Sequence, residues 1–418
     1  MLAALLSLPV GDRHPPLNLT PQKQKERTLQ ALVAQVQGLA ARQPVVMLFE
    51  DAQWSDPTSL ELFDLIIDRA PALPLLLIIT FRPEFSPPWT GRPHVTSRSL
   101  NRLTPRQRTE MIAGVTGGKA LPKEIAAQII DRTDGVPLFV EELTKAVVES
   151  GILTDTGSRF NAAGPVVPLA IPASLQASLL ARLDRLAPAR EVAQIGAALG
   201  RQFSHELLSA VAPMPPAQLD EALGQLVASE LVYRRGTPPD AEYTFKHALV
   251  QDAAYSTLLR GRRQHLHTRI AVALEERFPG TVESQPELLA HHCTEAGLSA
   301  RAVRYWQRAG ERATQRSAHV EAIAHLTKGL ETLKTLPETP EHTQQALTLY
   351  TALGAALMIA KGLGAPEVEH AYIQAHALCQ QVGETPELVP VLYGLYRFYN
   401  ARLCSSPNPR NHAATSMR

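Results

Sequence analysis

The sequence has few cysteines and no long apolar run. Its three cysteines, Cys293, Cys379 and Cys404, are widely spaced and odd in number. A disulfide framework is therefore excluded, and a reducing compartment is expected. No stretch of about 18 apolar residues occurs, so no helix is expected to span a bilayer. The apolar start, Met1 to Leu6, is short and lacks a basic leader, so it does not fit a signal peptide, and the predicted location is the cytoplasm.

An excess of charge of either sign is also missing. The 418 residues include 41 Lys and Arg against 40 Asp and Glu, which gives a formal net charge of +1. Such a balance provides no overall field that would hold nucleic acid or an anionic membrane. The hydrophobic fraction of 45% and the charged fraction of 19% are typical of folded protein and exclude wholesale disorder. The length predicts about two to four domains.

The first hundred residues have the apolar pattern of an α/β region. Short continuous apolar runs are typical of strands that are buried on both faces of a parallel sheet. A strand, a helix and a second strand in succession indicate an α/β arrangement. The pattern predicts a helix over 20–41, a strand over 45–49, a helix after Asp56, a strand over 75–80 and a third strand over 95–100.

Helical periodicity dominates after residue 104. Helices are predicted from there to Gly151, and no further strand is expected before residue 231. The stretch 152–171 is rich in Gly, Pro and small residues. It is therefore predicted to be a linker between domains.

The rest of the chain is predicted to form two helical regions and a tail. Residues 172–285 read as several short helices closed by a hairpin over 231–234 and 242–245, which is the outline of a winged helix. Over 286–404, small and large residues alternate on paired helices, a pattern typical of a tetratricopeptide-like solenoid. The tail, 405–418, lacks apolar periodicity and is predicted to be disordered.

The best candidate for chemistry is the acidic pair Glu50-Asp51, which directly follows the first apolar run. Ligands of parallel α/β folds bind at the carboxyl edge of the sheet. Adjacent strand residues point to opposite sides, so the two carboxylates cannot share one role. One can hold Mg²⁺ while the other orients an attacking water. On spacing alone, a solvated strand end without a function remains the alternative.

The segment Val45–Asp56 resembles the Walker B region of the STAND branch of AAA+-like P-loop ATPases. The resemblance gives Glu50 the magnesium position, where the family more often has Asp, and gives Asp51 the water-activating position. The strand end Thr80–Phe85 is similar to the sensor-1 region of the family, which places Arg82 near the terminal phosphate. The alternative for Arg82 is a surface ion pair.

Two later segments extend the resemblance. Gly135-Val136-Pro137 is similar to the GxP motif of the STAND class, whose proline packs near the adenine, so Gly135 and Pro137 are candidate nucleotide-binding residues. Tyr243–Tyr255 looks like the segment that joins winged helix to solenoid in bacterial predicted ATPases. Many of those relatives carry a cyclase or kinase domain. The resemblance therefore implies ATP or ADP with Mg²⁺ as cofactors of the complete family, and a cyclase or kinase output domain as a partner.

The phosphate-binding loop of the family is missing. Gly-x-x-x-x-Gly-Lys-Ser/Thr, whose amides cradle phosphates, does not occur in the sequence. Gly114–Lys119 has the wrong spacing and follows the acidic strand instead of preceding it. The expected fold is thus a partial P-loop core with an incomplete parallel sheet and a helical lid over 1–151, followed by the winged-helix and solenoid regions. Either the chain is shortened at its amino end, or another polypeptide supplies the missing half.

Three functions remain in view. The first is a STAND-type signal-transduction ATPase that turns over little or no ATP by itself. The second is a non-enzymatic scaffold that binds protein partners through its helical repeats, where the aromatic residues within 393–399 would otherwise be core. The third is DNA binding, but the candidate reading helix, 215–229, contains acidic residues and no Lys or Arg, which argues against it.

Overall fold

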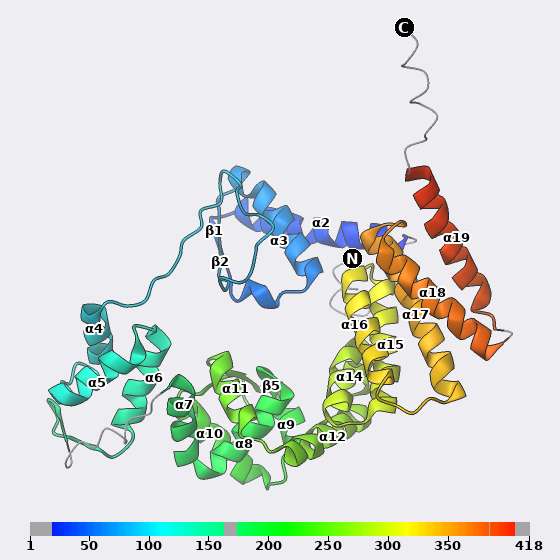
Figure 1. Cartoon of the computed structure of the whole chain (residues 1–418). Coiled ribbons are helices and arrows are strands. Elements are labelled where there is room, and N and C mark those ends of the chain that lie inside the picture. The colour runs from blue at the N-terminus through cyan, green and yellow to red at the C-terminus, as the bar shows by residue number, and fades with distance from the viewer. Residues whose placement is uncertain (1–18, 163–173, 384, 406–418) are drawn as a thin grey trace. The chain divides into compact units, whose positions relative to one another are not determined.

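The structure, a computed structural model, describes residues 19–162, 174–383 and 385–405 (Figure 1). The chain divides into two compact units. The first contains the described residues of Met1–Ser97, Gly280–Thr294 and Leu298–Arg418, and the second contains those of Arg98–Pro279 and Glu295–Gly297. This division does not coincide with the linker predicted over 152–171. The predicted disordered tail lies outside the described residues, apart from Ser405.

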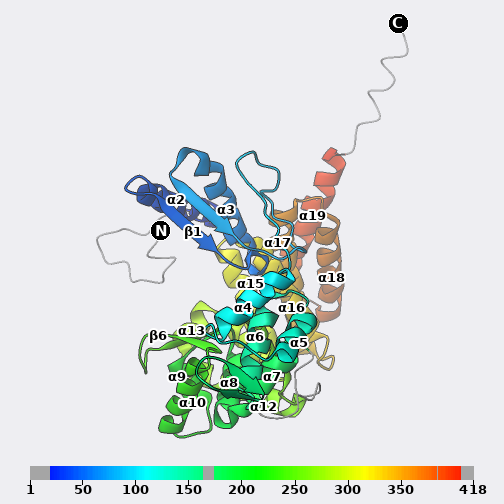
Figure 2. The same cartoon turned by 90° about the vertical axis from the view of Figure 1, so that its left-hand side faces the viewer.

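The first unit begins with an α/β layer. Its elements are α2 (Pro21–Ala40), β1 (Val45–Phe49), η1 (Ala52–Trp54), α3 (Pro57–Arg69), η2 (Ala70–Ala72) and β2 (Leu75–Ile79). The two strands are parallel, with Val45 opposite Leu75 and Phe49 opposite Ile79. Asp56 caps α3 through a 2.8 Å hydrogen bond from the amide three residues on. Figure 2 shows β1 beside α2 and α3.

One face of this two-stranded sheet is covered. Phe63 and Ile67 of α3, together with Trp89, pack against the inward side chains of both strands. The third strand predicted over 95–100 is absent from the described structure, and that prediction was wrong. A strand needs a neighbour for its backbone hydrogen bonds, whereas this segment is irregular and Leu100 is 97% exposed.

The remainder of the first unit is a solenoid-like stack of helices. They are α13 (Pro279–Ser284), α14 (Pro286–Glu295), α15 (Ser299–Gln315), α16 (His319–Leu333), α17 (Pro340–Lys361), α18 (Pro366–Val382) and α19 (Leu388–Ser405). Two pairs share one packing device. A Cβ built on Gly310 of α15 would lie 2.5 Å from Leu326 Cγ on α16, and one built on Gly354 of α17 would lie 2.7 Å from the Tyr372 ring on α18. In each pair, glycine lets a large side chain of the second helix approach the backbone of the first.

The second unit begins with a helical module closed by a small hairpin. Its elements are α4 (Pro105–Val115), α5 (Lys123–Thr133), α6 (Pro137–Val148), β3 (Leu153–Asp155) and β4 (Phe160–Ala162). Leu153 and Phe160 of the hairpin join Val140 and Leu143 of α6 in one buried core. The segment 152–162 is therefore structured, which corrects the prediction of a linker there and of no strand before residue 231. The sequence pattern concealed the hairpin because each strand contributes a single buried side chain.

A winged-helix-like module follows. It contains α7 (Leu175–Arg185), α8 (Ala187–Leu199), β5 (Gln202–Ser204), α9 (His205–Val211), α10 (Pro216–Ala228), β6 (Val232–Arg235), β7 (Glu242–Phe245) and α11 (Ala248–Ser256), and α12 (Arg260–Arg277) comes next. The predicted hairpin is present as β6 and β7, and β5 pairs with the other side of β7 in an antiparallel sheet. The aromatic side chains of Phe203, Tyr243 and Phe245 are buried and contact one another on this sheet. The Phe203 ring lies against Gly196 of α8.

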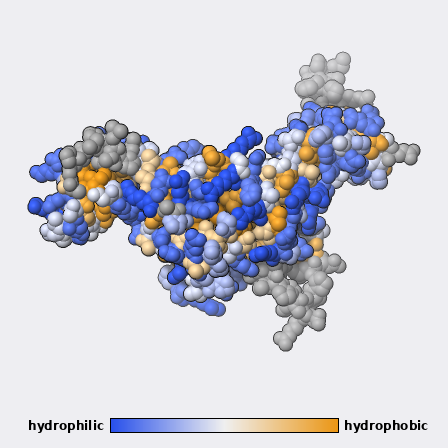
Figure 3. Space-filling model, turned by 90° about the horizontal axis from the view of Figure 1, so that it is seen from below, coloured by the Kyte–Doolittle hydropathy of each residue, from blue (hydrophilic) through white to orange (hydrophobic). Residues whose placement is uncertain are grey.

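The surface exposes apolar side chains in places. Figure 3 shows orange hydrophobic areas within a mostly blue face. Two groups stand out among the exposed large apolar residues, one on β1 and β2 and the other on α19. Within the described ranges, no helix combines the length and the apolar character needed to cross a membrane.

Candidate functional site

The acidic pair lies where β1 ends. β1 stops at Phe49, so Glu50 and Asp51 emerge from its carboxyl end. Asp51 has φ 59° and ψ 46°, a left-handed conformation that is uncommon for residues other than glycine. Thr80, at the end of β2, stabilises it: the Asp51 amide donates to Thr80 Oγ1 at 3.1 Å, and the Ala52 amide donates to the Thr80 carbonyl at 2.9 Å. The ends of both strands are thereby tied together at one edge of the sheet.

Gln53 links the acidic pair to the loop that follows β2 and contains Arg82. Its Nε2 donates to Asp51 Oδ1 at 3.0 Å, and its Oε1 accepts from the Arg82 amide at 3.2 Å. The Arg82 guanidinium lies 5.8 Å from the centre of the Trp54 ring. Glu50 and Arg82 are exposed and Asp51 is half-buried. The structure thus brings Glu50, Asp51 and Arg82 to one sheet edge, with Gln53 as the connecting side chain.

Gln53 and Thr80 were missed in the sequence analysis. Thr80 was assigned only as the end of a strand and the start of the sensor-1-like segment, and Gln53 only as part of the Walker B-like segment. The available signal was their position directly after the two predicted strands, because parallel strands end at a common edge.

The second face of the sheet is bare. Side chains alternate across a strand, so four apolar residues point away from α3. Val46, Leu48, Leu76 and Ile78 are 69%, 60%, 56% and 42% exposed. The prediction that both strands are buried on both faces was therefore wrong for the described residues. An exposed apolar face of this kind is a candidate interaction site.

Gly135 and Pro137 belong to the second unit, where they form a rigid corner. Gly135 has φ 74°, and a Cβ at this position would lie 2.5 Å from the Leu103 carbonyl oxygen. Its own carbonyl accepts a 2.7 Å hydrogen bond from the Leu103 amide. Pro137 starts α6, where its missing N–H costs nothing. The corner thus requires glycine and fixes the position at which α6 begins.

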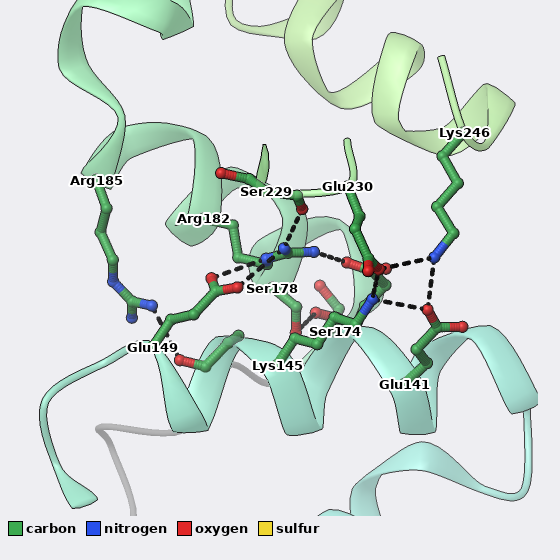
Figure 4. Close-up of polar contacts among 12 residues, drawn as sticks. Glu141, Lys145, Glu149, Ser174, Ser178, Arg182, Arg185, Ser229, Glu230 and Lys246 are labelled. Atoms are coloured by element: carbon green, nitrogen blue, oxygen red, sulfur yellow. Dashed lines mark hydrogen bonds and ion pairs between the residues drawn. The ribbon is translucent and has the colours of Figure 1, made fainter. Parts of the chain in front are cut away.

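A buried ionic cluster holds α6 to the winged-helix-like module (Figure 4). Its centre is Arg182 of α7, which is 2% exposed and pairs with Glu142 of α6, which is 1% exposed, at 2.5 Å. Arg182 also donates from Nε and Nη2 to the two carboxylate oxygens of Glu149, both at 2.9 Å. A further bond from Nη2 reaches the Ser229 carbonyl at 2.7 Å. One guanidinium therefore ties together α6, α7 and the turn after α10.

A second, more exposed part of the cluster involves two lysines. Lys246, which follows β7, donates to Glu141 of α6 at 2.7 Å, and Lys145 donates to the same oxygen at 3.0 Å. Both lysines also pair with Glu230. Burial on its own would raise the pKa of Glu141, but the hydrogen bonds from Lys246 and Lys145 outweigh it and lower that pKa from 4.5 to about 2. The carboxylate is thus strongly held in its ionised form.

Comparison with known proteins gives distant similarities. No family model matches the chain. An uncharacterized protein of Rhizobium meliloti (strain 1021) is 28% identical over 384 residues, which cover 90% of this chain and 37% of that protein. The chain thus spans little more than a third of the length of this relative. Among solved structures, the chain is similar to a signal transduction ATPase with numerous domains (STAND) that has a tetratricopeptide repeat sensor, from Pyrococcus horikoshii. The identity is 11% and the TM-score 0.40, with 90% of this chain and 54% of that chain covered.

Proposed function

We propose that this chain carries part of a STAND-type nucleotide switch and that the phosphate-binding loop of the switch lies outside the chain. One observation carries the proposal: two parallel strands end together at an acidic pair, and one apolar face of their sheet is uncovered. Parallel sheets are normally covered on both faces. A further layer of an α/β core would cover this face.

The residues at the sheet edge fit the metal side of such a site. In this proposal Glu50 would hold Mg²⁺, directly or through water. Asp51, whose carboxylate accepts a hydrogen bond from Gln53, would orient the attacking water. Arg82 would act on the terminal phosphate. Gly135 and Pro137 belong to the second unit, so their adenine role rests on the resemblance alone and is not part of the site at this sheet edge. Bound Mg²⁺ would neutralise charge on the phosphates of ATP or ADP. The sequence supplies no loop of backbone amides for those phosphates, so the chain alone is expected to turn over little or no ATP.

A phosphate-release assay on the 418-residue chain tests this expectation. With ATP and Mg²⁺, wild type, Glu50→Ala and Asp51→Ala should all match the background rate. Steady hydrolysis by the wild-type chain that either substitution abolishes would contradict the proposal, because the site would then be complete without a P-loop.

The second candidate function is a protein-interaction scaffold. The stacked helix pairs of the first unit favour it, since helical repeats commonly bind protein partners along their extended surfaces. In the switch proposal the same repeats would receive the signal, and a cyclase or kinase domain would be the output. A pull-down in which the full chain loses a defined partner when the repeats are altered, while the acidic pair is intact, would favour the scaffold.

A further inference from the structure

Helix α15 of the solenoid-like stack carries a row of arginines along one side (Figure 1). Its members recur at intervals of four residues, so each lies one turn of helix from the next. We call them the arginine row: Arg304, Arg308, Arg312 and Arg316. The row is about 18 Å long. The side of α15 that packs into the stack carries the buried residues instead, namely Ala302, Val303, Trp306, Ala309, Gly310 and Ala313.

Acidic side chains do not compensate the charge of the arginine row. Arg304, Arg308 and Arg316 are exposed, and none of the four arginines forms an ion pair with a carboxylate in the described part of the chain. Arg312 donates to a backbone oxygen, the Glu283 carbonyl, at 2.6 Å, while its Nε is buried without an acceptor. Partial burial and the charge of Arg312 lower the pKa of Arg316. Like charges one turn apart repel each other, and an anionic partner would relieve this repulsion.

The stability of α15 explains only half of the arginine row. The last turn of a helix favours cations, which accounts for the final two arginines but not for Arg304 and Arg308. The single acidic residue of α15, Glu311, accepts a 2.8 Å hydrogen bond from Gln307 and pairs with neither of them. The Arg308 guanidinium lies 5.6 Å from the centre of the Tyr305 ring. Among the described residues, Arg304 and Arg308 therefore make no ion pair that would explain them by the stability of the helix.

The spacing of the arginine row indicates what kind of partner fits it. Residues four apart form the ridge through which two helices most often pack. Carboxylates four apart on a second helix recur at the same distance along its axis, and a guanidinium binds a carboxylate through two parallel hydrogen bonds. A nucleic acid fits less well, because its phosphates would continue beyond the row to the negative charges of Glu311 and Glu287. A two-fold contact between two copies would place the row against itself.

We propose that the arginine row of α15 is a docking surface for an acidic helix of another protein, with Asp or Glu at intervals of about four residues. The row gives the scaffold function proposed above a partner of defined chemistry. The inference therefore rests on that function and does not depend on nucleotide binding.

A peptide titration with the full chain tests the proposal. The probe is a fluorescein-labelled, alanine-rich helical peptide with glutamate at every fourth position, and its control has glutamine at those positions. Fluorescence anisotropy should show that the glutamate peptide binds at least about tenfold more tightly than the glutamine peptide. This preference should shrink as the ionic strength rises.

Reversing the charge of two arginines tests the row itself. The double variant Arg304→Glu, Arg308→Glu should bind the glutamate peptide at least about tenfold more weakly than wild type and should gain affinity for a peptide with lysine at the same positions. Arg397→Glu on α19 is the matched control, because Arg397 is also exposed and lies 5.9 Å from the centre of the Tyr393 ring. It should leave binding unchanged. Since the substituted side chains are exposed, unchanged circular dichroism and thermal transitions are expected and would show that the variants fold.

Four results would overturn the proposal. Equal binding of the glutamate and glutamine peptides, or binding that the double variant leaves unchanged, would show that the row selects no acidic helix. A labelled oligonucleotide that binds more tightly than the glutamate peptide, and that the double variant releases, would assign the row to nucleic acid. A wild-type dimer in sedimentation velocity that the double variant converts to monomer would assign it to a second copy. A protein partner of the repeats that the double variant still binds would place the scaffold function on another surface and leave that function intact.

Discussion

Replacing Arg182 by alanine is expected to lower the free energy of unfolding of the second unit by about 3–5 kcal/mol. The magnitude follows from the partner that remains. Glu142 is 1% exposed and would be left as a buried carboxylate without its cation. Glu149 is 40% exposed, so it can be rehydrated and contributes little to the loss. Replacing both members of the buried pair, as in Arg182→Met with Glu142→Leu, should recover most of the stability, because neither charge then remains.

Arg185→Ala is the matched control. Arg185 lies on the same helix and also reaches α6, through one hydrogen bond of 2.9 Å to the Ala146 carbonyl, but it is exposed. Its loss should cost at most about 1 kcal/mol. Hydrogen exchange followed by mass spectrometry on the full chain reports the opening of α6 and α7 without requiring a single two-state transition. If Arg182→Ala accelerated exchange there no more than Arg185→Ala does, the reasoning about the buried pair would be refuted.

Two further predictions concern the second unit. The pKa of Glu141 falls from 4.5 to about 2 in the folded chain, so its pairing with Lys246 stabilises the fold above pH 4.5, and this contribution is lost as the pH falls toward 2. The difference in the free energy of unfolding between wild type and Glu141→Gln should therefore vanish at the acid end of acid unfolding curves. A difference that stays constant with pH would refute the linkage. In denaturant unfolding, Gly135→Ala should lower the free energy of unfolding by clearly more than the roughly 1 kcal/mol expected for Gly151→Ala. The two glycines have φ 74° and 75°, but only a Cβ at position 135 would meet Leu103. Equal decreases in the free energy of unfolding would show that the close approach to Leu103 is unimportant.

Local patterns predicted much of the secondary structure. The strands over 45–49 and 75–79 are present because apolar runs of five residues that follow a proline and end at a polar residue suit a strand. Asp56 marked the start of α3. The hairpin of β6 and β7 is also where its turn residues placed it. The hairpin of β3 and β4 was missed because three-residue strands carry too few side chains for a period to be recognised.

The candidate site was predictable only in part. The sequence indicated Glu50, Asp51 and Arg82 because acidic and basic residues followed predicted strands. The role of Gln53 as a bridge depends on the turn conformation of Asp51, which no local pattern reveals. The ionic cluster around Arg182 joins residues up to 105 positions apart, so only the tertiary fold brings them together.

The most direct test of the nucleotide-switch account is the ATPase activity of the gene product that includes any in-frame sequence preceding residue 1. The account predicts that this sequence encodes a glycine-lysine loop and that the extended protein hydrolyses ATP. It also predicts that Asp51→Asn lowers the rate about 100-fold or more, whereas Asp240→Asn, in the β6–β7 turn, has no effect. Hydrolysis that is insensitive to Asp51→Asn would contradict the assignment of the acidic pair, and an extended protein without such a loop would contradict an upstream source of the missing half.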